Sequence, residues 1–462
     1  NMQAMFLGAS AFNQPIGDWD VSSVTTMYAM FRDAARFNQP IGNWKTGNVE
    51  TMHGMFQRNG VFNQPIGHWD TGRVTDMGYM FNEAAAFNQP IGRWDVSSVK
   101  TMYATFRGAE AFDFPIGNWD TLGVDTMHGM FQRAWSFNQP IGSWTVSQVT
   151  DTSYMFESAV AFNHDITGWT RVTTDSTAMF RDATAWLAIY SRDTGVDGPA
   201  SEWSLGSQYC GENERVSAGA CVACPSGYVN APGDDKNGGD TTCGECAEDH
   251  YVAAGACVAC AAGYVSARRD RVDGGDTTCY ETFETVCREN EHVSFNECVA
   301  CPAGHRNARG DSTAGGNTHC VECAKDHRVS SGACVACPAG YENPAGDDST
   351  GRDTTCDEKI VHTEAFATLT ELTEKLDSCA DPCDEVEFWD VSQLTSLAGA
   401  FQGRSGFNGD ISGWDVSKVT DMSSTFEGAS AFNQPIGRWD VSSVTNMQAM
   451  FLGASAFNQP IG

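Results

Sequence analysis

WDVSSVTTMYAMFRDAARFNQPIG, residues 19–42, is one copy of a pattern that recurs along most of this chain. Its first apolar residues, at positions 19, 21 and 24, indicate a short extended run. The next apolar residues, at positions 27, 30, 31 and 34, have the spacing of one face of a two-turn helix. Thr26 stands where a helix cap is expected, and Pro40 with Gly42 favours a closing turn. The copy therefore predicts strand, helix and turn.

The phenylalanine of the FNQPIG motif returns every 25 residues, with one deletion before Trp186: Phe12, Phe37, Phe62, Phe87, Phe112, Phe137, Phe162, Trp186, and again Phe407, Phe432 and Phe457. A two-turn helix is too short to be stable alone, so neighbouring copies must stack. We therefore predict an α+β repeat solenoid of the leucine-rich-repeat type, with a short strand and a two-turn helix in each 25-residue coil. A disulfide-rich, helix-poor array of modules interrupts it.

Stacking at this period aligns equal positions into columns. One column holds tryptophans, from Trp19 to Trp169, and another holds asparagines, from Asn13 to Asn163. The asparagines can bond to backbone groups, as in leucine-rich repeats. Asp113 interrupts their column, so the coil around Phe112 is the expected site of a local irregularity.

The first 17 residues, NMQAMFLGASAFNQPIG, recur unchanged as residues 446–462, an offset of 445 residues. We interpret the chain as a window from a longer periodic array, with a single recent duplication as the alternative. Residues 363–379 carry Phe366, Leu369, Leu372 and Leu376 on one helical face, as expected of a capping helix. The predicted organisation is a solenoid over 1–204, cysteine modules over 205–358, a cap over 359–385 and a solenoid over 386–462.

Composition excludes several classes of function. The 462 residues carry a formal net charge of −31 and no basic run, which disfavours nucleic acid and anionic membranes as partners. We expect no transmembrane segment, because no stretch reaches the ~18–20 apolar residues that a membrane helix needs. The eighteen cysteines, concentrated between Cys210 and Cys383, indicate an oxidising compartment and hence an extracellular or cell-surface location.

Sixteen of these cysteines form four units with the spacing C-x10-C-x2-C-x18-C. Zinc is the alternative to disulfides, but grouping by CxxC pairs leaves Cys210 alone and spaces Cys279 and Cys287 too widely. The second and third cysteines of a unit are separated by only two residues and bridge awkwardly. We therefore predict first-to-third and second-to-fourth pairing, although sequence alone leaves the connectivity open. The predicted bonds are Cys210–Cys224, Cys221–Cys243, Cys246–Cys260, Cys257–Cys279, Cys287–Cys301, Cys298–Cys320, Cys323–Cys337, Cys334–Cys356 and, in the cap, Cys379–Cys383.

Candidate chemistry is sparse, and we predict no catalytic residue and no cofactor. His53 and His128 share a repeat position, without a recurring nucleophile or carboxylate, and are interpreted as core or surface filler. Asp240, Asp276 and Asp353 each precede a cysteine by three residues, among glycines and other aspartates. Calcium prefers such oxygen donors, but the spacing of a known calcium loop is missing, so we favour simple turns.

Two resemblances follow from these motifs. Residues 19–41 and 414–436 match the pattern WDVSxVTxMxxMFxxAxxFNQxI of the mycoplasma-type surface-lipoprotein repeat, the BspA-like family. That resemblance implies a secreted or surface-exposed solenoid, used in adhesion or of unknown role. The runs CVACPSGYVNAPGDD and CVACPAGYENPAGDD resemble ephrin-receptor and tumour-necrosis-factor-receptor modules, which implies extracellular spacers or ligand-binding rods.

The sequence thus favours a non-enzymatic extracellular structural protein, the repeating unit of a long fibre or surface appendage, whose partners are copies of itself. The alternative is a surface adhesin or receptor ectodomain that binds a protein or glycan through the face of the repeats. A periodic array beyond both ends would favour the fibre, and an adjacent membrane anchor or signalling domain would favour the receptor.

Overall fold

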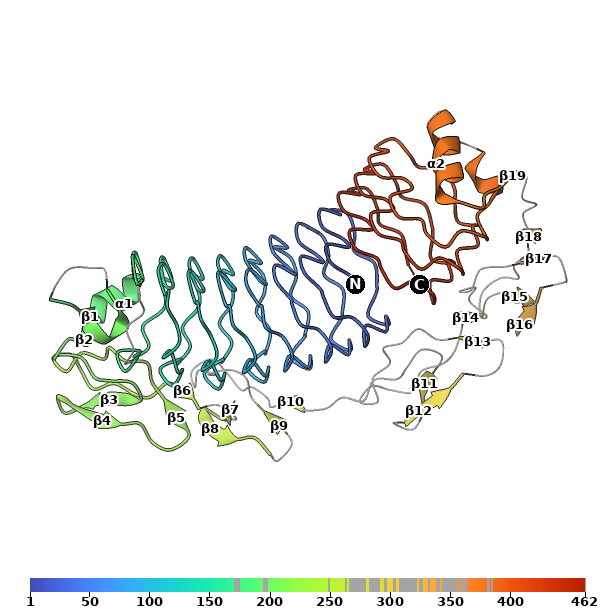
Figure 1. The fold of residues 1–462 in the computed structure, drawn as a ribbon. Helices are drawn as coiled ribbons and strands as arrows, with labels where there is room; N and C mark the ends of the chain where they lie inside the picture. Colours follow the sequence, from blue (N-terminus) through green and yellow to red (C-terminus); the bar gives the residue numbers. More distant parts are fainter. Residues whose placement is uncertain are drawn as a thin grey trace.

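The computed structural model describes residues 1–169, 175–193, 198–247, 250–261, 364–379, 383 and 385–461, together with short segments between 264 and 358. Figure 1 shows the 25-residue repeats as a stack of similar coils, with both chain termini inside the stack. Parallel single-residue bridges join successive coils at one repeat position, for example Thr26 to Thr51 and Ser396 to Asp421. The repeats are therefore held coil against coil.

The predicted fold class, an α+β solenoid with a strand and a two-turn helix in each coil, is wrong. Residues 28–33, inside the predicted helix, are consecutive turns, and the predicted strand reduces to the single bridging residue Thr26. The side chains expected to cap helices close turns instead. In one such turn, the Asp76 carboxylate accepts the N–H of Gly78, two residues on, at 2.8 Å.

The backbone hydrogen bonds explain the absence of the helix. The N–H groups of Met27, Ala29, Phe31 and Asp33 donate to carbonyl oxygens of the next coil, at residues 51, 53, 55 and 57, over 3.1, 2.7, 2.9 and 2.9 Å. A helix would send each N–H to the carbonyl four residues earlier in the same coil. Ala29 and Asp33 also have positive φ values, 52° and 58°, which lie outside the right-handed helical region. The apolar spacing thus serves packing between coils without forming a helix.

The core consists of aromatic columns that run through the stack. Phe31 lies 3.9 Å from Phe37 in its own coil and 5.8 Å from Phe56 in the next, measured between ring centroids. The tryptophans stack likewise, Trp44 on Trp69 at 6.3 Å, and the Trp44 indole N–H donates to the Ile16 carbonyl at 3.0 Å. Each coil therefore buries its rings only by contact with its neighbours.

The asparagine column forms a ladder in which each side-chain oxygen accepts the N–H of the next asparagine. The expected irregularity at Asp113 does not interrupt it. The Asp113 N–H donates to Asn88 at 3.0 Å, and its carboxylate accepts the Asn138 N–H at 2.8 Å and the Gln139 amide at 2.8 Å. Burial raises the pKa of this carboxyl, against the lowering effect of these hydrogen bonds. An aspartate keeps the geometry because its Oδ accepts as an asparagine's does.

The two identical segments occupy adjacent coils. The N–H groups of Met447 and Phe451 donate to the carbonyls of Asn1 and Met5 at 3.1 and 2.9 Å, in the pattern that joins covalently successive coils. Two phenylalanine pairs stack across this contact at 5.5 and 6.0 Å. The order of the described parts of the stack is therefore residues 385–461, then 1–169, then 175–193 (Figure 1).

Short elements lie at the two outer ends of the stack. At one end are α1 (Thr184–Ile189), β1 (Tyr190–Ser191), η1 (Ala200–Glu202) and β2 (Ser204–Leu205), with β1 antiparallel to β2. At the other are β19 (Glu364–Ala365), α2 (Leu369–Ser378), η2 (Val386–Phe388) and β20 (Trp389–Asp390), with β19 parallel to β20.

Helix α2 covers the end of the stack where a capping helix is predicted. Thr368 and Glu371 form a capping box at its start, and Leu372 and Leu376 are buried. Arg404 lies in the coils that follow this helix in sequence, and its guanidinium donates to the Leu376 carbonyl at 3.2 Å.

The cysteine region contains antiparallel strand pairs, visible along one side of the stack in Figure 1. Four are four-residue hairpins: β3 (Glu214–Ser217) with β4 (Ala220–Ala223), β7 (His250–Ala253) with β8 (Ala256–Ala259), β11 (Glu291–Ser294) with β12 (Glu297–Ala300), and β15 (His327–Ser330) with β16 (Ala333–Ala336). Four are two-residue pairs: β5 (Tyr228–Val229) with β6 (Glu245–Cys246), β9 (Tyr264–Val265) with β10 (Tyr280–Glu281), β13 (His305–Arg306) with β14 (Glu322–Cys323), and β17 (Tyr341–Glu342) with β18 (Asp357–Glu358).

Candidate functional site

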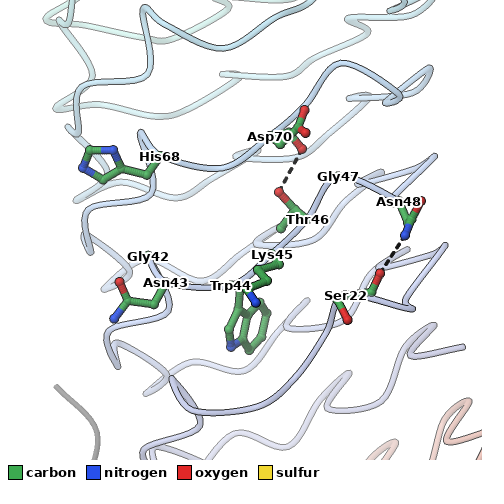
Figure 2. A pocket seen from close by; sticks show the side chains of 10 residues that line it. All are labelled: Ser22, Gly42, Asn43, Trp44, Lys45, Thr46, Gly47, Asn48, His68 and Asp70. Carbon is green, nitrogen blue, oxygen red and sulfur yellow. Dashed lines mark hydrogen bonds between the residues drawn. The ribbon is translucent and has the colours of Figure 1, made fainter. Parts of the chain in front are cut away.

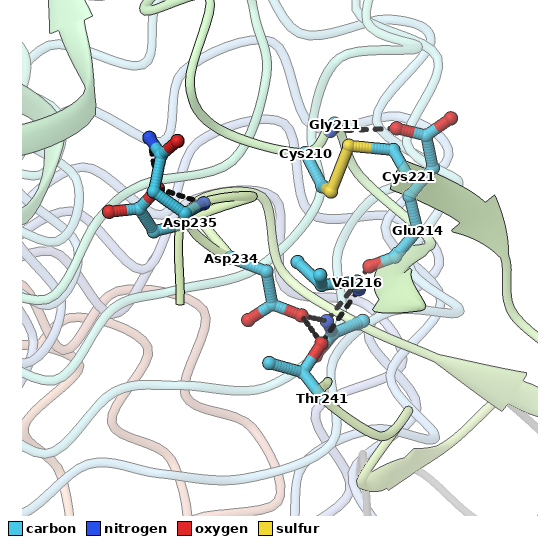
Figure 3. The surroundings of a disulfide bond; sticks show 10 residues. Cys210, Gly211, Glu214, Val216, Cys221, Asp234, Asp235 and Thr241 are labelled. Atoms are coloured by element: carbon cyan, nitrogen blue, oxygen red, sulfur yellow. Dashed lines mark hydrogen bonds between the residues drawn. A yellow bond between two sulfur atoms is a disulfide. The ribbon is translucent and has the colours of Figure 1, made fainter. Parts of the chain in front are cut away.

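The first cysteine unit pairs its cysteines in sequence order. Figure 3 shows the disulfide between Cys210 and Cys221, whose Cα atoms lie 5.4 Å apart, and a second bond joins Cys224 to Cys243 across 5.8 Å. The predicted bonds Cys210–Cys224 and Cys221–Cys243 are therefore wrong. The hairpin of β3 and β4 is the reason, because it folds the second cysteine back to bridging distance of the first and leaves the third for the fourth.

The second unit begins in the same way. Cys246 bonds Cys257, which excludes the predicted Cys246–Cys260 and Cys257–Cys279 bonds. Cys260, like Cys301, Cys334 and Cys337, is disulfide-bonded. The partners needed to judge the predicted bonds of the last two units lie outside the described residues: Cys287–Cys301, Cys298–Cys320, Cys323–Cys337 and Cys334–Cys356.

In the cap, Cys379 bonds Cys383, the pair that the sequence predicts. None of the cysteines that the structure describes is a free thiol. One group of potential metal ligands gathers in the described part of the chain, Cys210, Glu214 and Cys221. Two of its three donors are sulfurs bonded to each other, so the group is a disulfide beside a glutamate and offers no thiolate for zinc.

Of the calcium candidates, only Asp240 lies within the described residues, and it takes part in a turn contact. Its carboxylate accepts the N–H of Ala218 at 2.7 Å. The neighbouring Asp234 carboxylate accepts from the Thr241 hydroxyl and the Asn230 amide. These contacts tie the tail of the unit to its hairpin. Asp276 and Asp353 lie outside the described residues, so the calcium hypothesis stays untested for them.

A shallow pocket of about 610 Å³ opens beside Trp44, in the coils between residues 22 and 70. Figure 2 shows that its lining residues, among them Lys45, His68 and Asp70, come from successive coils. The hydrogen bonds drawn there hold the coils together: the Thr46 hydroxyl donates to the Asp70 carbonyl at 2.8 Å, and the Asn48 amide donates to the Ser22 carbonyl at 2.7 Å. Its polar groups thus serve cohesion between coils.

A row of aromatic side chains runs along the surface of six successive coils. We call it the aromatic row: Tyr28, His53, Tyr79, Tyr103, His128 and Tyr154. Successive ring centroids lie 4.9, 5.4, 5.0, 4.5 and 5.5 Å apart. The guanidinium of Arg181 lies over the last ring, 5.1 Å from its centroid. All six aromatic residues keep part of their surface exposed, and Tyr28 is 36% exposed.

The two histidines of the row are anchored at Nδ1. His53 Nδ1 lies 3.2 Å from the Asp76 carboxylate, and His128 Nδ1 lies 2.7 Å from the Ser153 hydroxyl and 3.3 Å from the Asp151 carboxylate. Sequence reasoning interpreted these histidines as filler because it compared one repeat position at a time. Four members of the row stand two residues after the bridging position, and Tyr79 and Tyr154 stand three residues after it, so a search across both positions would have found the row.

The repeats of this chain match a known family model. The family model described as "Mycoplasma protein of unknown function, DUF285" matches residues 1–92, 84–191 and 370–462. These segments make up more than half of the chain, and the chain belongs to this family. The predicted resemblance to a mycoplasma-type repeat family is therefore confirmed. The resemblance of the cysteine units to receptor modules stays a prediction.

No curated protein and no solved structure matches the chain. Among the described residues, no helix has the length and apolar character needed to span a bilayer.

Proposed function

We propose that this chain is a non-enzymatic extracellular structural protein that forms the repeating unit of a long fibre or cell-surface appendage. The contact between residues 446–461 and 1–17 carries the proposal. These segments are 445 positions apart in sequence, yet they bond as covalently successive coils do. In the structure both sides of this contact belong to one chain. Because the contact needs no peptide link, its exchange between copies, with the end of one chain packed on the start of the next, would join them head to tail.

The chemistry of the cysteine region supports an extracellular location. The described bonds Cys210–Cys221, Cys224–Cys243, Cys246–Cys257 and Cys379–Cys383 are of the kind that persists in oxidising compartments. The BspA-like and receptor-module resemblances point the same way, since both imply surface or secreted proteins. Within this proposal the cysteine units act as stapled spacers between the stacks of coils.

Electron microscopy of native material tests the proposal directly. Fibres with one regular axial period are expected, whereas isolated globular particles would contradict it. Light scattering of the purified chain over a range of concentrations should give masses that rise above 49.9 kDa. A mass equal to one chain at every concentration would count against head-to-tail contact.

A matched pair of variants locates the contact. The Asn458 side chain accepts the Asn13 N–H at 3.0 Å and the Gln14 amide at 2.9 Å, both across the contact. Asn458→Leu should therefore reduce the mass of the assembly. The Asn433 side chain accepts the Asn458 N–H at 2.9 Å within residues 385–461, one coil away from the contact, so Asn433→Leu should lower stability while assembly persists.

A surface adhesin or receptor ectodomain is the second candidate, and the aromatic row is the observation that favours it. Half-exposed tyrosines are common in protein binding sites because they combine a rigid apolar ring with a polar hydroxyl.

A further inference from the structure

We propose that the aromatic row and the ion pairs beside it form an elongated binding face for a neutral linear polysaccharide. The inference goes beyond the fibre and rests on the adhesin candidate, to which it adds a location and a class of ligand.

The fold does not require aromatic side chains at this place. In coils outside the row, the second residue after the bridging position is Gln3, Thr177, Ala398, Ser423 or Gln448, and the third is Ala4, Ala178, Gly399, Ser424 or Ala449. Their backbone bonds are nevertheless the same: the Ser424 N–H donates to the Gln448 carbonyl at 2.8 Å, as the Ala29 N–H donates to the His53 carbonyl at 2.7 Å. Since the coil closes equally well without a ring, the row is a property of the surface of residues 28–154 alone.

Arginines in the coils of the row and in the coil after it are paired with carboxylates. Arg58 lies between Asp33 and Glu83, at 3.8 and 3.4 Å, and about half of the Arg58 and Glu83 side chains is exposed. Arg181 pairs with Glu157 while it covers the last ring of the row. Arg58 and Arg181 therefore each face a carboxylate, and the chain as a whole carries a formal net charge of −31. The net negative charge disfavours an anionic polymer, whereas the uncharged hydroxyl groups of a neutral polymer can accept from arginine and donate to carboxylate.

The rings suit a ligand that is apolar on one side and hydroxylated on the other. A sugar ring has this character, and tyrosine matches it with an apolar ring and a hydroxyl that donates and accepts. Burial, with a hydrogen bond to Tyr103, raises the pKa of Tyr79, so its hydroxyl keeps its proton at physiological pH. Tyr79 and Tyr154 are inclined by 61° and 59° to the histidine before them, so these two rings are not covered by parallel stacking on that side.

The regular spacing decides between a polymer and a folded partner. The row offers one ring from each of six coils, with neighbouring centroids 4.5–5.5 Å apart. A ligand that repeats the same unit along a line can contact one ring after another, and each contact raises the effective concentration of the next. A linear polysaccharide has this repetition, and a globular protein surface lacks it.

Depletion isotherms of the full chain with microcrystalline cellulose and with chitin, two neutral linear polysaccharides, test the inference. We expect saturable binding to at least one of them. Tyr79→Ala and Tyr154→Ala should each weaken it about tenfold, as expected for truncation of a central interface tyrosine. Gln448→Ala is the control, because Gln448 takes the place that Tyr28 and Tyr103 take in their coils, two residues after the bridging position, but in a coil outside the row, and it should leave binding unchanged.

The urea midpoint of each variant shows whether it is folded. If the alanine variants do not fold, Tyr79→Phe and Arg181→Gln replace them, since they keep most of the packing while they remove a hydroxyl or a charge. Failure of the unmodified chain to bind either polymer, binding to heparin in preference to both, or equal binding by folded row variants and the control would each overturn the inference. None of these results depends on fibre formation, which light scattering measures separately.

Discussion

Replacement of Trp94 by alanine tests whether the stacked columns hold the coils together. The Trp94 side chain is 4% exposed, and its ring lies 6.2 Å from that of Trp69 with an angle of 1° between the planes. Its indole N–H donates to the Ile66 carbonyl of the preceding coil at 3.1 Å. The substitution therefore leaves a cavity between coils and removes the donor from a carbonyl that spans them.

The two effects set the expected magnitude. Truncation of a buried tryptophan costs ~3–5 kcal/mol, and loss of the donor to the Ile66 carbonyl adds ~1 kcal/mol, so the free energy of unfolding should fall by ~4–6 kcal/mol. With a urea m-value of ~3 kcal/mol/M, the midpoint should fall by about 1.3–2 M. The fluorescence of the remaining tryptophans reports the transition. Trp94→Phe keeps an aromatic ring but loses the indole donor, and it should fall between wild type and Trp94→Ala.

Arg93 provides the adjacent control. It is exposed, and Arg93→Ser should change the free energy of unfolding by no more than ~0.5 kcal/mol. Equal midpoint shifts for Arg93→Ser and Trp94→Ala would refute the reasoning, because they would show that the tryptophan column does not stabilise the stack.

Three further outcomes are expected. Peptide mapping without reduction should link Cys210 to Cys221 and Cys224 to Cys243, and recovery of Cys210 linked to Cys224 would contradict the hairpin pairing. Burial raises the pKa of Asp113, so the folded chain binds this proton more tightly than the unfolded chain, and the stability gained at low pH is lost as the pH rises through the folded pKa. Asp113→Asn should therefore raise the urea midpoint more at pH 7 than at pH 3. An equal change at both pH values would rule out this linkage. Chelation of calcium by EDTA should leave the midpoint unchanged, because the described candidate carboxylate already bonds a backbone N–H in a turn, and a fall in the midpoint would favour a calcium site.

The 25-residue period alone was enough to predict which residues meet. Equal positions of successive copies must align when the copies stack, so the tryptophan, phenylalanine and asparagine columns follow directly from the spacing, and the structure contains all three. The capping helix was also predictable, because α2 carries its own start signal, Thr368 with Glu371, and its own apolar face. These features depend on residues close in sequence or repeated at one interval.

The conformation of each coil depended on the neighbouring coil. A spacing of 27, 30, 31 and 34 fits one helix face, but the N–H of Met27 bonds to the Thr51 carbonyl, and that acceptor exists only once the stack has formed. The disulfide pairing likewise required the hairpin of β3 and β4, since the spacing of four cysteines is compatible with several connectivities. The aromatic row joins different repeat positions across coils. The sequence by itself therefore determined the contacts that repeat at one position, whereas only the tertiary structure decided where each backbone hydrogen bond and each thiol found its partner, because those partners are brought into reach by folding.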